Sequence, residues 1–341
     1  MRVTIKDIAE LMNISASTVS RALGGSSKIS NKTREQIKKI ARKLNYQPNI
    51  TAQGLISGKT HNIGVILNKD IREYTSVQIF NSIIINGILE VAEAHNYNLN
   101  FAIDAGVDKL GALSRIIENE DVDGVLIINV VSEDILAKLC VNKIPVVLID
   151  NHFDNTSAFA VNNDDQKGAY IATTHLISLG YKSIGLMGIA EEAFQRECRL
   201  GFLQALADHG LKANSNFIRK ANGGLESAYE EITKMIKQGH IPRGIFAIND
   251  EMAIGAIKAI KDKGLRVPGD TAVVGMDDMP LLDYIDTPLT TMRIHIAEMG
   301  RVAVQMLLDL IQGKYLGKKQ IAISPKLVIR KSCGAYLFQK D

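Results

Sequence analysis

Asp150, Asn249 and Asp277 each lie at or just past the end of an apolar run of strand length. In open α/β sheets, ligands bind in the crevice beyond the carboxyl ends of the strands. A planar carboxylate or amide can hydrogen-bond two vicinal hydroxyls. We therefore predict a site for a small sugar-type ligand at these residues. A carboxylate at a strand end also serves often as a helix cap, and that alternative stays open for Asp164, Asp250 and Asp278.

Motifs of enzyme chemistry are absent from the sequence. It has no GxxxxGK[ST] phosphate loop, no GxGxxG, no GxSxG elbow and no His/Cys cluster with metal spacing. The seven histidines are dispersed, and we interpret His295, beside an apolar helix, as structural. Cys140, Cys198 and Cys333 are scattered and odd in number, which favours reduced, structural thiols. We expect a binding protein that is not an enzyme and needs no cofactor or metal.

A second kind of chemistry is suggested near the N-terminus. After a break at Asn13 and Ile14, a helix opens with Ser15, Ala16, Ser17 and Thr18 and carries Arg21 about a turn and a half further on. Small or hydroxylated side chains suit base edges and phosphate oxygens, and an arginine can fork onto guanine. Two short helices joined by a tight turn are typical of a helix-turn-helix unit. A generic three-helix bundle with an exposed arginine remains the alternative.

Three short helices position these residues. Thr4 can cap a first helix, Ser15 a second and Ser30 a third. Pro48 prevents the third helix from continuing. Residues 1–60 contain 11 Lys or Arg against 3 Asp or Glu, whereas the rest contains 29 against 34. A basic head on a mildly acidic body fits a head that meets phosphate, although a solvated basic surface would look the same.

Beyond residue 60 the pattern changes to strands alternating with helices. Continuous apolar runs separated by amphipathic helices indicate parallel sheets that are covered on both faces. The units are too many for one sheet of usual size, so we predict two βα lobes. We expect strands near 63–67, 99–103, 124–128, 146–149, 184–187, 245–248 and 272–274, and helices near 79–94, 166–179, 250–263 and 296–311.

The N-terminal segment closely resembles the head of the LacI/GalR repressor family. The resemblance implies that Ala16, Ser17 and Arg21 read bases, and that Thr4, Ser15 and Thr18 lie in the same DNA-binding unit. It also implies a hinge that folds on operator DNA, in which Leu55 levers open a minor-groove step. The matching residues include Thr4-Ile5-Lys6-Asp7-Ile8-Ala9, Thr18-Val19-Ser20-Arg21-Ala22-Leu23, Thr33-Arg34, Tyr46, Pro48-Asn49, Ala52 and Leu55.

The core resembles the same family and, through it, the periplasmic sugar-binding proteins. This resemblance makes Arg196 an effector contact, together with Phe80 and Asn81 at the start of the first core helix. The sequence Gln78-Ile79-Phe80-Asn81 departs from the family's frequent Asp-Pro-aromatic-aromatic pattern, which puts those two contacts in doubt. The matching stretches include Val122-Asp123-Gly124, Asn249-Asp250-Glu251-Met252, Val274-Gly275-Met276-Asp277-Asp278 and Pro288-Leu289-Thr290-Thr291.

The resemblance implies an α/β protein with an all-α head and a two-lobed core of doubly wound parallel sheets. We expect a head at 1–46, a hinge at 47–60, a first lobe at 61–161 with about 291–322, and a second lobe at 162–290 with about 323–341. Tail sequences such as Pro325-Lys326-Leu327 resemble galactose and β-galactoside operon repressors, so we expect galactose or a galactoside as effector.

The expected partners are double-stranded operator DNA, a small sugar-type effector and a second copy of the chain. We see no apolar run that approaches the ~18 residues of a membrane span and no apolar signal core, so we expect no membrane contact and a cytoplasmic location. Two alternatives stay open: a free solute-binding protein that delivers sugar to a transporter, and a repressor that answers a protein co-repressor.

Overall fold

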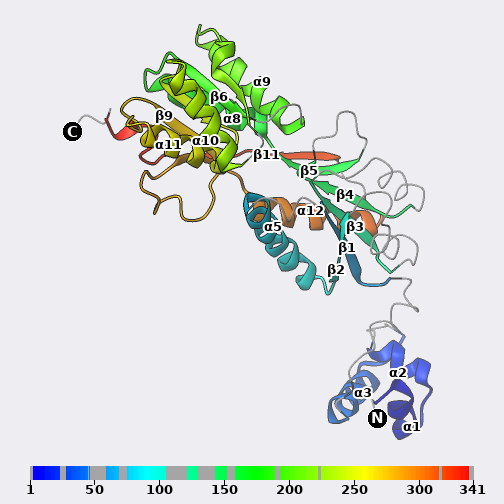
Figure 1. Ribbon diagram of the computed structural model, residues 1–341. Coiled ribbons are helices and arrows are strands. Elements are labelled where there is room, and N and C mark those ends of the chain that lie inside the picture. The colour runs from blue at the N-terminus through cyan, green and yellow to red at the C-terminus, as the bar shows by residue number, and fades with distance from the viewer. Residues whose placement is uncertain are drawn as a thin grey trace. The chain divides into compact units, whose positions relative to one another are not determined.

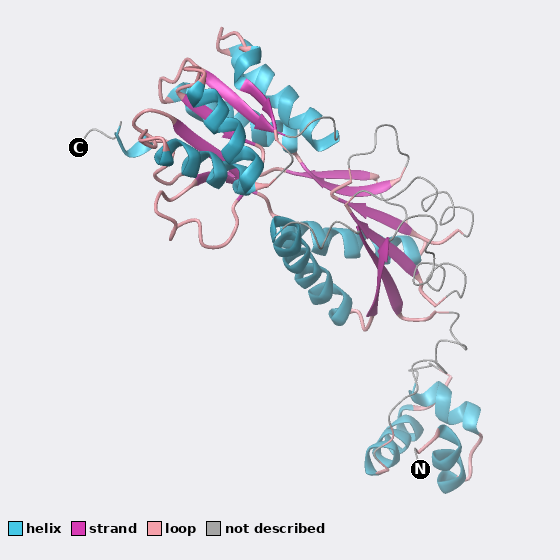
Figure 2. Cartoon of the chain, in the orientation of Figure 1, coloured by secondary structure: helices cyan, strands magenta, loops and turns pink. Residues whose placement is uncertain are grey.

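The computed structural model forms two compact units, Met1–His61 and Asn62–Asp341 (Figures 1 and 2). Each unit has a hydrophobic core of its own. The structure describes residues 3–23, 28–44, 46, 59–68, 75–104, 121–129, 143–151, 158–188, 193–221, 224–314 and 317–337.

Helices α1 (Ile5–Met12), α2 (Ala16–Leu23) and α3 (Asn31–Lys43) make up the described part of the first unit. The three predicted helix starts are confirmed. Oδ2 of Asp7 accepts hydrogen bonds from the backbone N–H and the hydroxyl of Thr4, at 2.7 and 2.9 Å. Oγ of Ser15 accepts one from the Thr18 backbone, and Oγ of Ser30 one from the Thr33 backbone, each at 3.2 Å. The helices bury a small common core of Ile8, Ala9, Val19, Ala22, Ile37 and Ala41.

Two six-stranded sheets form the described framework of the second unit. The first has the order β11-β5-β4-β3-β1-β2 and is parallel throughout. Its strands are β1 (Asn62–Asn68), β2 (Asn98–Asp104), β3 (Gly124–Ile128), β4 (Val146–Ile149), β5 (Phe159–Asn163) and β11 (Gln320–Ile323). The predicted architecture of two parallel sheets is confirmed.

The second sheet has the order β12-β10-β9-β8-β6-β7. It is parallel except for β12, which pairs with β10 in the antiparallel sense. Its strands are β6 (Ile184–Gly188), β7 (Ile218–Lys220), β8 (Gly244–Ala247), β9 (Ala272–Asp277), β10 (Thr290–Arg293) and β12 (Lys326–Val328). The inner strands β6, β8 and β9 are buried almost throughout, as apolar strands covered on both faces must be.

Paired helices cover these sheets. On the first sheet α5 (Thr75–Ala94) packs against α12 (Ile296–Ile311). On the second, α8 (Asp165–Ser178) packs against α9 (Ala193–Asp208), and α10 (Leu225–Lys237) against α11 (Asp250–Asp262). Glycines allow the close approach, because a Cβ on Gly87, Gly201 or Gly255 would overlap a backbone carbonyl of the neighbouring helix. Two 3-10 turns, η2 (Ser215–Phe217) and η3 (Ala335–Leu337), complete the described elements.

The chain passes between the sheets three times. The last strand residues before these crossings are Asn163, Arg293 and Ile323. The lobe boundaries expected from the sequence, at 161/162, 290/291 and 322/323, stay a prediction. Strand β10 therefore belongs to the second sheet, and the helix that follows it, α12, packs on the first sheet.

Helix α5 corrects the expectation that no apolar stretch is long enough to span a membrane. Within the described residues, Val77–Ala94 meets the length and composition of a span, with a mean hydropathy of 1.2. It carries only Glu90 and Glu93 as charged side chains. Its apolar residues Ile84, Ile88 and Ala92 lie fully buried in the core of the first sheet. This packing accounts for the apolar residues on one face of the helix, since 28% of the stretch is buried.

Candidate DNA interface and effector site

Helix α2 separates a buried face from a polar, exposed one. Val19 and Ala22 are fully buried, whereas Ser17 and Arg21 are exposed. The hydroxyl of Ser15 lies 2.8 Å from those of Ser17 and of Thr18, so the start of the helix presents a linked row of hydroxyls. An exposed arginine beyond that row can reach a base edge, and the hydroxyls can reach phosphate. Ala16 is half-buried and Thr4 exposed. The predicted hinge contacts Asn49, Ala52 and Leu55 lie outside the described residues.

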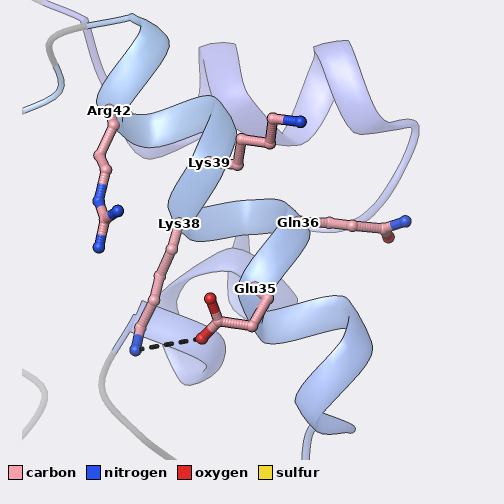
Figure 3. A pocket seen from close by; sticks show the side chains of 5 residues that line it. All are labelled: Glu35, Gln36, Lys38, Lys39 and Arg42. Carbon is pink, nitrogen blue, oxygen red and sulfur yellow. Dashed lines mark ion pairs between the residues drawn. The ribbon is translucent and has the colours of Figure 1, made fainter.

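Helix α3 adds a basic surface to the first unit. Its inner residues Ile37 and Ala41 are buried, and a shallow hollow on its outer side is lined by Glu35, Gln36, Lys38, Lys39 and Arg42 (Figure 3). The ion pair of Lys38 with Glu35, at 3.6 Å, uses the helix's single acidic side chain. The helix therefore presents a net positive field, which favours nucleic acid as a partner.

A buried carboxylate, Asp250, occupies the second sheet's carboxyl edge. It is inaccessible to solvent, and its Oδ1 accepts a 2.6 Å hydrogen bond from the hydroxyl of Thr291. Its Oδ2 accepts a 2.8 Å bond from the backbone N–H of Met279. Burial raises the pKa of Asp250 to about 6, against the effect of these bonds. The bonds tie the start of α11 to β10 and to the turn after β9.

Asp277, the predicted ligand contact at the end of β9, lies beside Asp250. Its carboxylate accepts a hydrogen bond from the Asp250 backbone, and burial, followed by the charge of Asp250, raises its pKa well above the usual range. Asp165 and Asp150 act on it in the same direction. Asp150 follows β4 of the first sheet, so carboxylates from both sheets share one electrostatic neighbourhood. The arrangement favours a ligand that donates hydrogen bonds.

Asn249 serves as a helix cap. Its side-chain oxygen accepts a 2.8 Å hydrogen bond from the Met252 backbone at the start of α11. Asp164 caps α8 in the same way, through Lys167 at 3.1 Å. The alternative that Asp164 caps a helix is thus confirmed. Asp250 does not cap α11; it is buried and hydrogen-bonded to Thr291 and Met279, and its neighbour Asn249 is the cap. The role of Asn249 as an effector contact stays a prediction.

Amides that the sequence did not single out line the carboxyl edge of the first sheet. Nδ2 of Asn151 donates to the Asn129 carbonyl at 2.8 Å, and Nδ2 of Asn163 donates to Asp165 at 2.5 Å. Because both acceptors are oxygens, each amide orientation is fixed. The oxygens Oδ1 of Asn151 and Asn163 are buried and have no hydrogen-bond partner within the described structure. The signal for these residues was available: polar side chains at or within two residues of the ends of the apolar strands β3, β4 and β5.

The remaining predicted contacts lie on helices. Arg196 is exposed on α9, and Cys198 on the same helix is fully buried. Burial, followed by the charges of Asp165 and Glu197, raises the pKa of the Cys198 thiol. Phe80 is half-buried and packs against the core of the first sheet. Asn81 is 3% exposed and donates to the Val77 carbonyl at 2.7 Å. These roles as effector contacts stay predictions.

Comparison with known proteins defines the class. Residues 4–49 match the model for bacterial regulatory proteins of the lacI family, and residues 173–333 match the periplasmic binding protein-like domain. The HTH-type transcriptional repressor PurR of Aliivibrio salmonicida is 30% identical over 333 residues, covering 96% of this chain and 98% of that protein. The probable repressor ExuR of Bacillus subtilis is 30% identical and covers 97% and 98%.

Solved structures agree over nearly the whole chain. A lac repressor dimer bound to operator and the anti-inducer ONPF superposes with a TM-score of 0.81 and 28% identity, covering 98% of this chain and 99% of that one. The fold and the exposed helix α2 are those of a helix-turn-helix DNA-binding protein. The chain belongs to the lacI family of bacterial regulatory proteins and is a DNA-binding transcriptional repressor. The similar curated proteins are repressors, which fits a role other than catalysis.

Proposed function

We propose that a small, neutral sugar controls how tightly this repressor binds its operator. The observation that carries the proposal is the position of Asp277 at the end of β9 and of Asp150 just after β4, at the carboxyl edges of two different sheets. A ligand bridging the two edges would bind one lobe arrangement better than another. Differential affinity of that kind is what shifts an equilibrium between two states.

The donor and acceptor inventory supports a polyhydroxylated ligand. Asp277, Asp150 and the buried oxygens of Asn151 and Asn163 are acceptors, and hydroxyls can donate to all of them. We retain galactose or a galactoside as the first candidate, with Arg196, Asn249, Phe80 and Asn81 as further contacts. Similar repressors include a ribose operon repressor of Haemophilus influenzae, at 29% identity, alongside PurR and ExuR. The effector is therefore to be chosen by experiment.

The DNA contacts of the proposal follow from α2 and the hinge. Ser15, Ala16, Ser17, Thr18 and Arg21 would meet the major groove, with Thr4 at the adjoining backbone. Asn49, Ala52 and Leu55 would enter the minor groove, where an apolar wedge kinks the duplex. The basic α3 surface would add attraction to phosphate. Such a protein works where operator DNA is, in the cytoplasm.

A dimer is the proposed working form. Tyr284 and Leu281, in the turn between β9 and β10, are 86% and 71% exposed, the highest values among the exposed large apolar side chains of the described residues. Two exposed apolar side chains within one turn suit a symmetric contact with a second copy. Two heads on one dimer would read two half-sites, so a palindromic operator is expected.

The test combines DNA selection with calorimetry on the full chain. Duplexes enriched from a palindromic library should bind with a salt-sensitive, sequence-selective affinity. Galactose should change that affinity and release heat on binding, with lactose and glucose as comparisons. Arg21→Ala supplies the control for DNA recognition. Selective DNA binding with silence from every sugar would favour a protein co-repressor, and sugar binding without DNA binding would favour the solute-binding alternative.

A further inference from the structure

The turn between β9 and β10 concentrates left-handed backbone at residues other than glycine. Asp277, Asp278 and Leu281 have φ values of 133°, 60° and 76°. Side chains disfavour this region, so such residues persist only where the surroundings hold them in place. The turn begins at Asp277, a proposed effector contact, and also carries Leu281 and Tyr284 of the proposed dimer surface. The contacts that hold this turn in place therefore affect both the proposed effector site and the proposed dimer surface.

One arginine from outside the turn supplies much of that restraint. Arg330, two residues after the end of β12, has a side chain only 10% exposed. Its guanidinium pairs with Asp278 at 2.8 Å and with Asp283 at 2.7 Å. It also donates to the carbonyl of Leu289, where the turn enters β10, at 2.9 Å. A single planar group thus fastens the start, the middle and the end of the turn.

Contacts that do not involve Arg330 also restrain the turn. The Asp278 carboxylate, 7% exposed, also pairs with Arg293 at 2.6 Å. The backbone of Met279 is held by Asp250 at 2.8 Å, and Leu282 is buried at 2% exposure. Between these anchors, Leu281 and Tyr284 project to solvent. A displacement of Asp277 or Asp278 cannot be absorbed locally, because the neighbouring residues are fixed.

We propose that Arg330 is a positioning residue that couples the effector site to the dimer surface by holding Asp278 and Asp283 in one rigid turn. This inference rests on the proposed function. With Arg330 in place, a change at Asp277 moves Leu281 and Tyr284. Without it, the turn relaxes and the two ends respond separately. The guanidinium is suited to this role since its planar fork can bond two carboxylates and a carbonyl at once, whereas an ammonium group is a point charge.

A double-mutant cycle tests the coupling without requiring a known effector. The dimer dissociation constant of the full chain is measured by sedimentation for wild type, Asp277→Asn, Arg330→Gln and the double variant. We expect Asp277→Asn to shift that constant at least about fivefold when Arg330 is present, the lower range of allosteric coupling. In the Arg330→Gln background the shift should fall below about twofold, within the error of additive sites.

Two further variants distinguish a loss of coupling from a loss of folding. Asp283→Asn removes only the outer, exposed pair and leaves no buried charge unpaired, because Arg330 still pairs with Asp278. It should also reduce the Asp277→Asn effect. Arg330→Lys should restore it in part. Arg301→Gln, which breaks an exposed pair with Glu90 at 3.1 Å, is the matched control and should leave the effect intact.

The outcomes separate this inference from the proposed function. An Asp277→Asn shift that is equal with and without Arg330, or that is absent in the wild-type background, overturns the coupling role. A chain that is monomeric at every concentration defeats the dimer proposal and the coupling together. Band shifts on the same samples report operator binding independently of dimerisation. A wild-type chain that dimerises but binds no operator would count against the proposed function alone.

Discussion

The hydroxyl of Thr291 donates a 2.6 Å hydrogen bond to Oδ1 of Asp250, and neither residue is accessible to solvent. The contact joins β10 to the start of α11. Gly275 on the neighbouring strand β9 makes room for it, because a Cβ there would overlap the Asp250 carboxylate. A buried carboxylate is costly unless it is hydrogen-bonded, and this one has bonds on both oxygens. It stabilises the turn that begins with Asp277.

Asp250→Asn should change how stability depends on pH. Burial raises the folded pKa to about 6 from 3.8, so between those pH values the folded state keeps a proton that the unfolded state has lost. The stability from that proton is present below pH 3.8 and is lost as pH rises through 6. Asparagine is uncharged, and its single carbonyl oxygen can keep one of the two accepted hydrogen bonds. The variant should therefore lack this decline, which is worth at most about 3 kcal/mol. Urea unfolding at a series of pH values measures it.

Asp250→Ala is the companion to that experiment. It removes both hydrogen bonds and leaves the Met279 N–H and the Thr291 hydroxyl unsatisfied, so it should destabilise the protein at every pH, by about 1–3 kcal/mol for each orphaned group. A decline with pH that survives in Asp250→Asn would assign the titration to another group.

Asp277→Asn should abolish the response to effector and leave operator binding intact at protein concentrations where the chain is fully dimeric. The substitution replaces the carboxyl group that a ligand hydroxyl would meet, while DNA recognition is proposed for the separate first unit. Band shifts with and without the identified sugar measure both properties on one sample. Asp208→Asn, on the exposed end of α9, is the control. A normal response in Asp277→Asn would remove this residue from the effector site.

Arg21→Ala should relax discrimination at one base pair and cost about 1–3 kcal/mol of operator binding. The side chain is exposed beside the buried Val19–Ala22 face, so the fold should be unaffected. Lys6→Ala, on exposed α1, should by contrast weaken any binding equally across sequences. Selection of operators by each variant distinguishes the two effects, and unchanged selectivity in Arg21→Ala would exclude it from base readout.

The elements predictable from sequence are those with a strong local signal. Strands β1, β3, β4, β6 and β8 are continuous apolar runs, and their positions agree with the prediction to within a residue or two. β10 (TTMR) and β7 (IRK) gave no such signal. In β10, buried Thr290 and Thr291 are satisfied by Ser332 and Asp250, partners 42 and 41 residues away. Such a strand becomes recognisable only in the folded sheet.

The same limit applies to the site. Asp150, Asn249 and Asp277 could be proposed because they follow apolar strands. The sequence could not show which of Asn249 and Asp250 caps the helix and which is buried with hydrogen bonds to other strands, because the two residues are adjacent and of similar chemistry. Nor could it connect Asp278 with Arg330, because the pair forms only when β12 is added beside β10.

Gly87→Ala should destabilise the second unit by overpacking the contact between α5 and α12. A Cβ at Gly87 would overlap the carbonyl oxygen of Ala297, which is backbone and cannot swing aside. Overpacking of this kind costs about 1–3 kcal/mol. Gly317→Ala is the matched control, because a Cβ there would meet no atom within 4 Å. The urea concentration at the unfolding midpoint should be lower for Gly87→Ala than for wild type and unchanged for Gly317→Ala. The dependence of the unfolding free energy on urea concentration should be the same in all three proteins. Equal midpoints would mean that the helices can separate without loss, contrary to their buried packing on the first sheet.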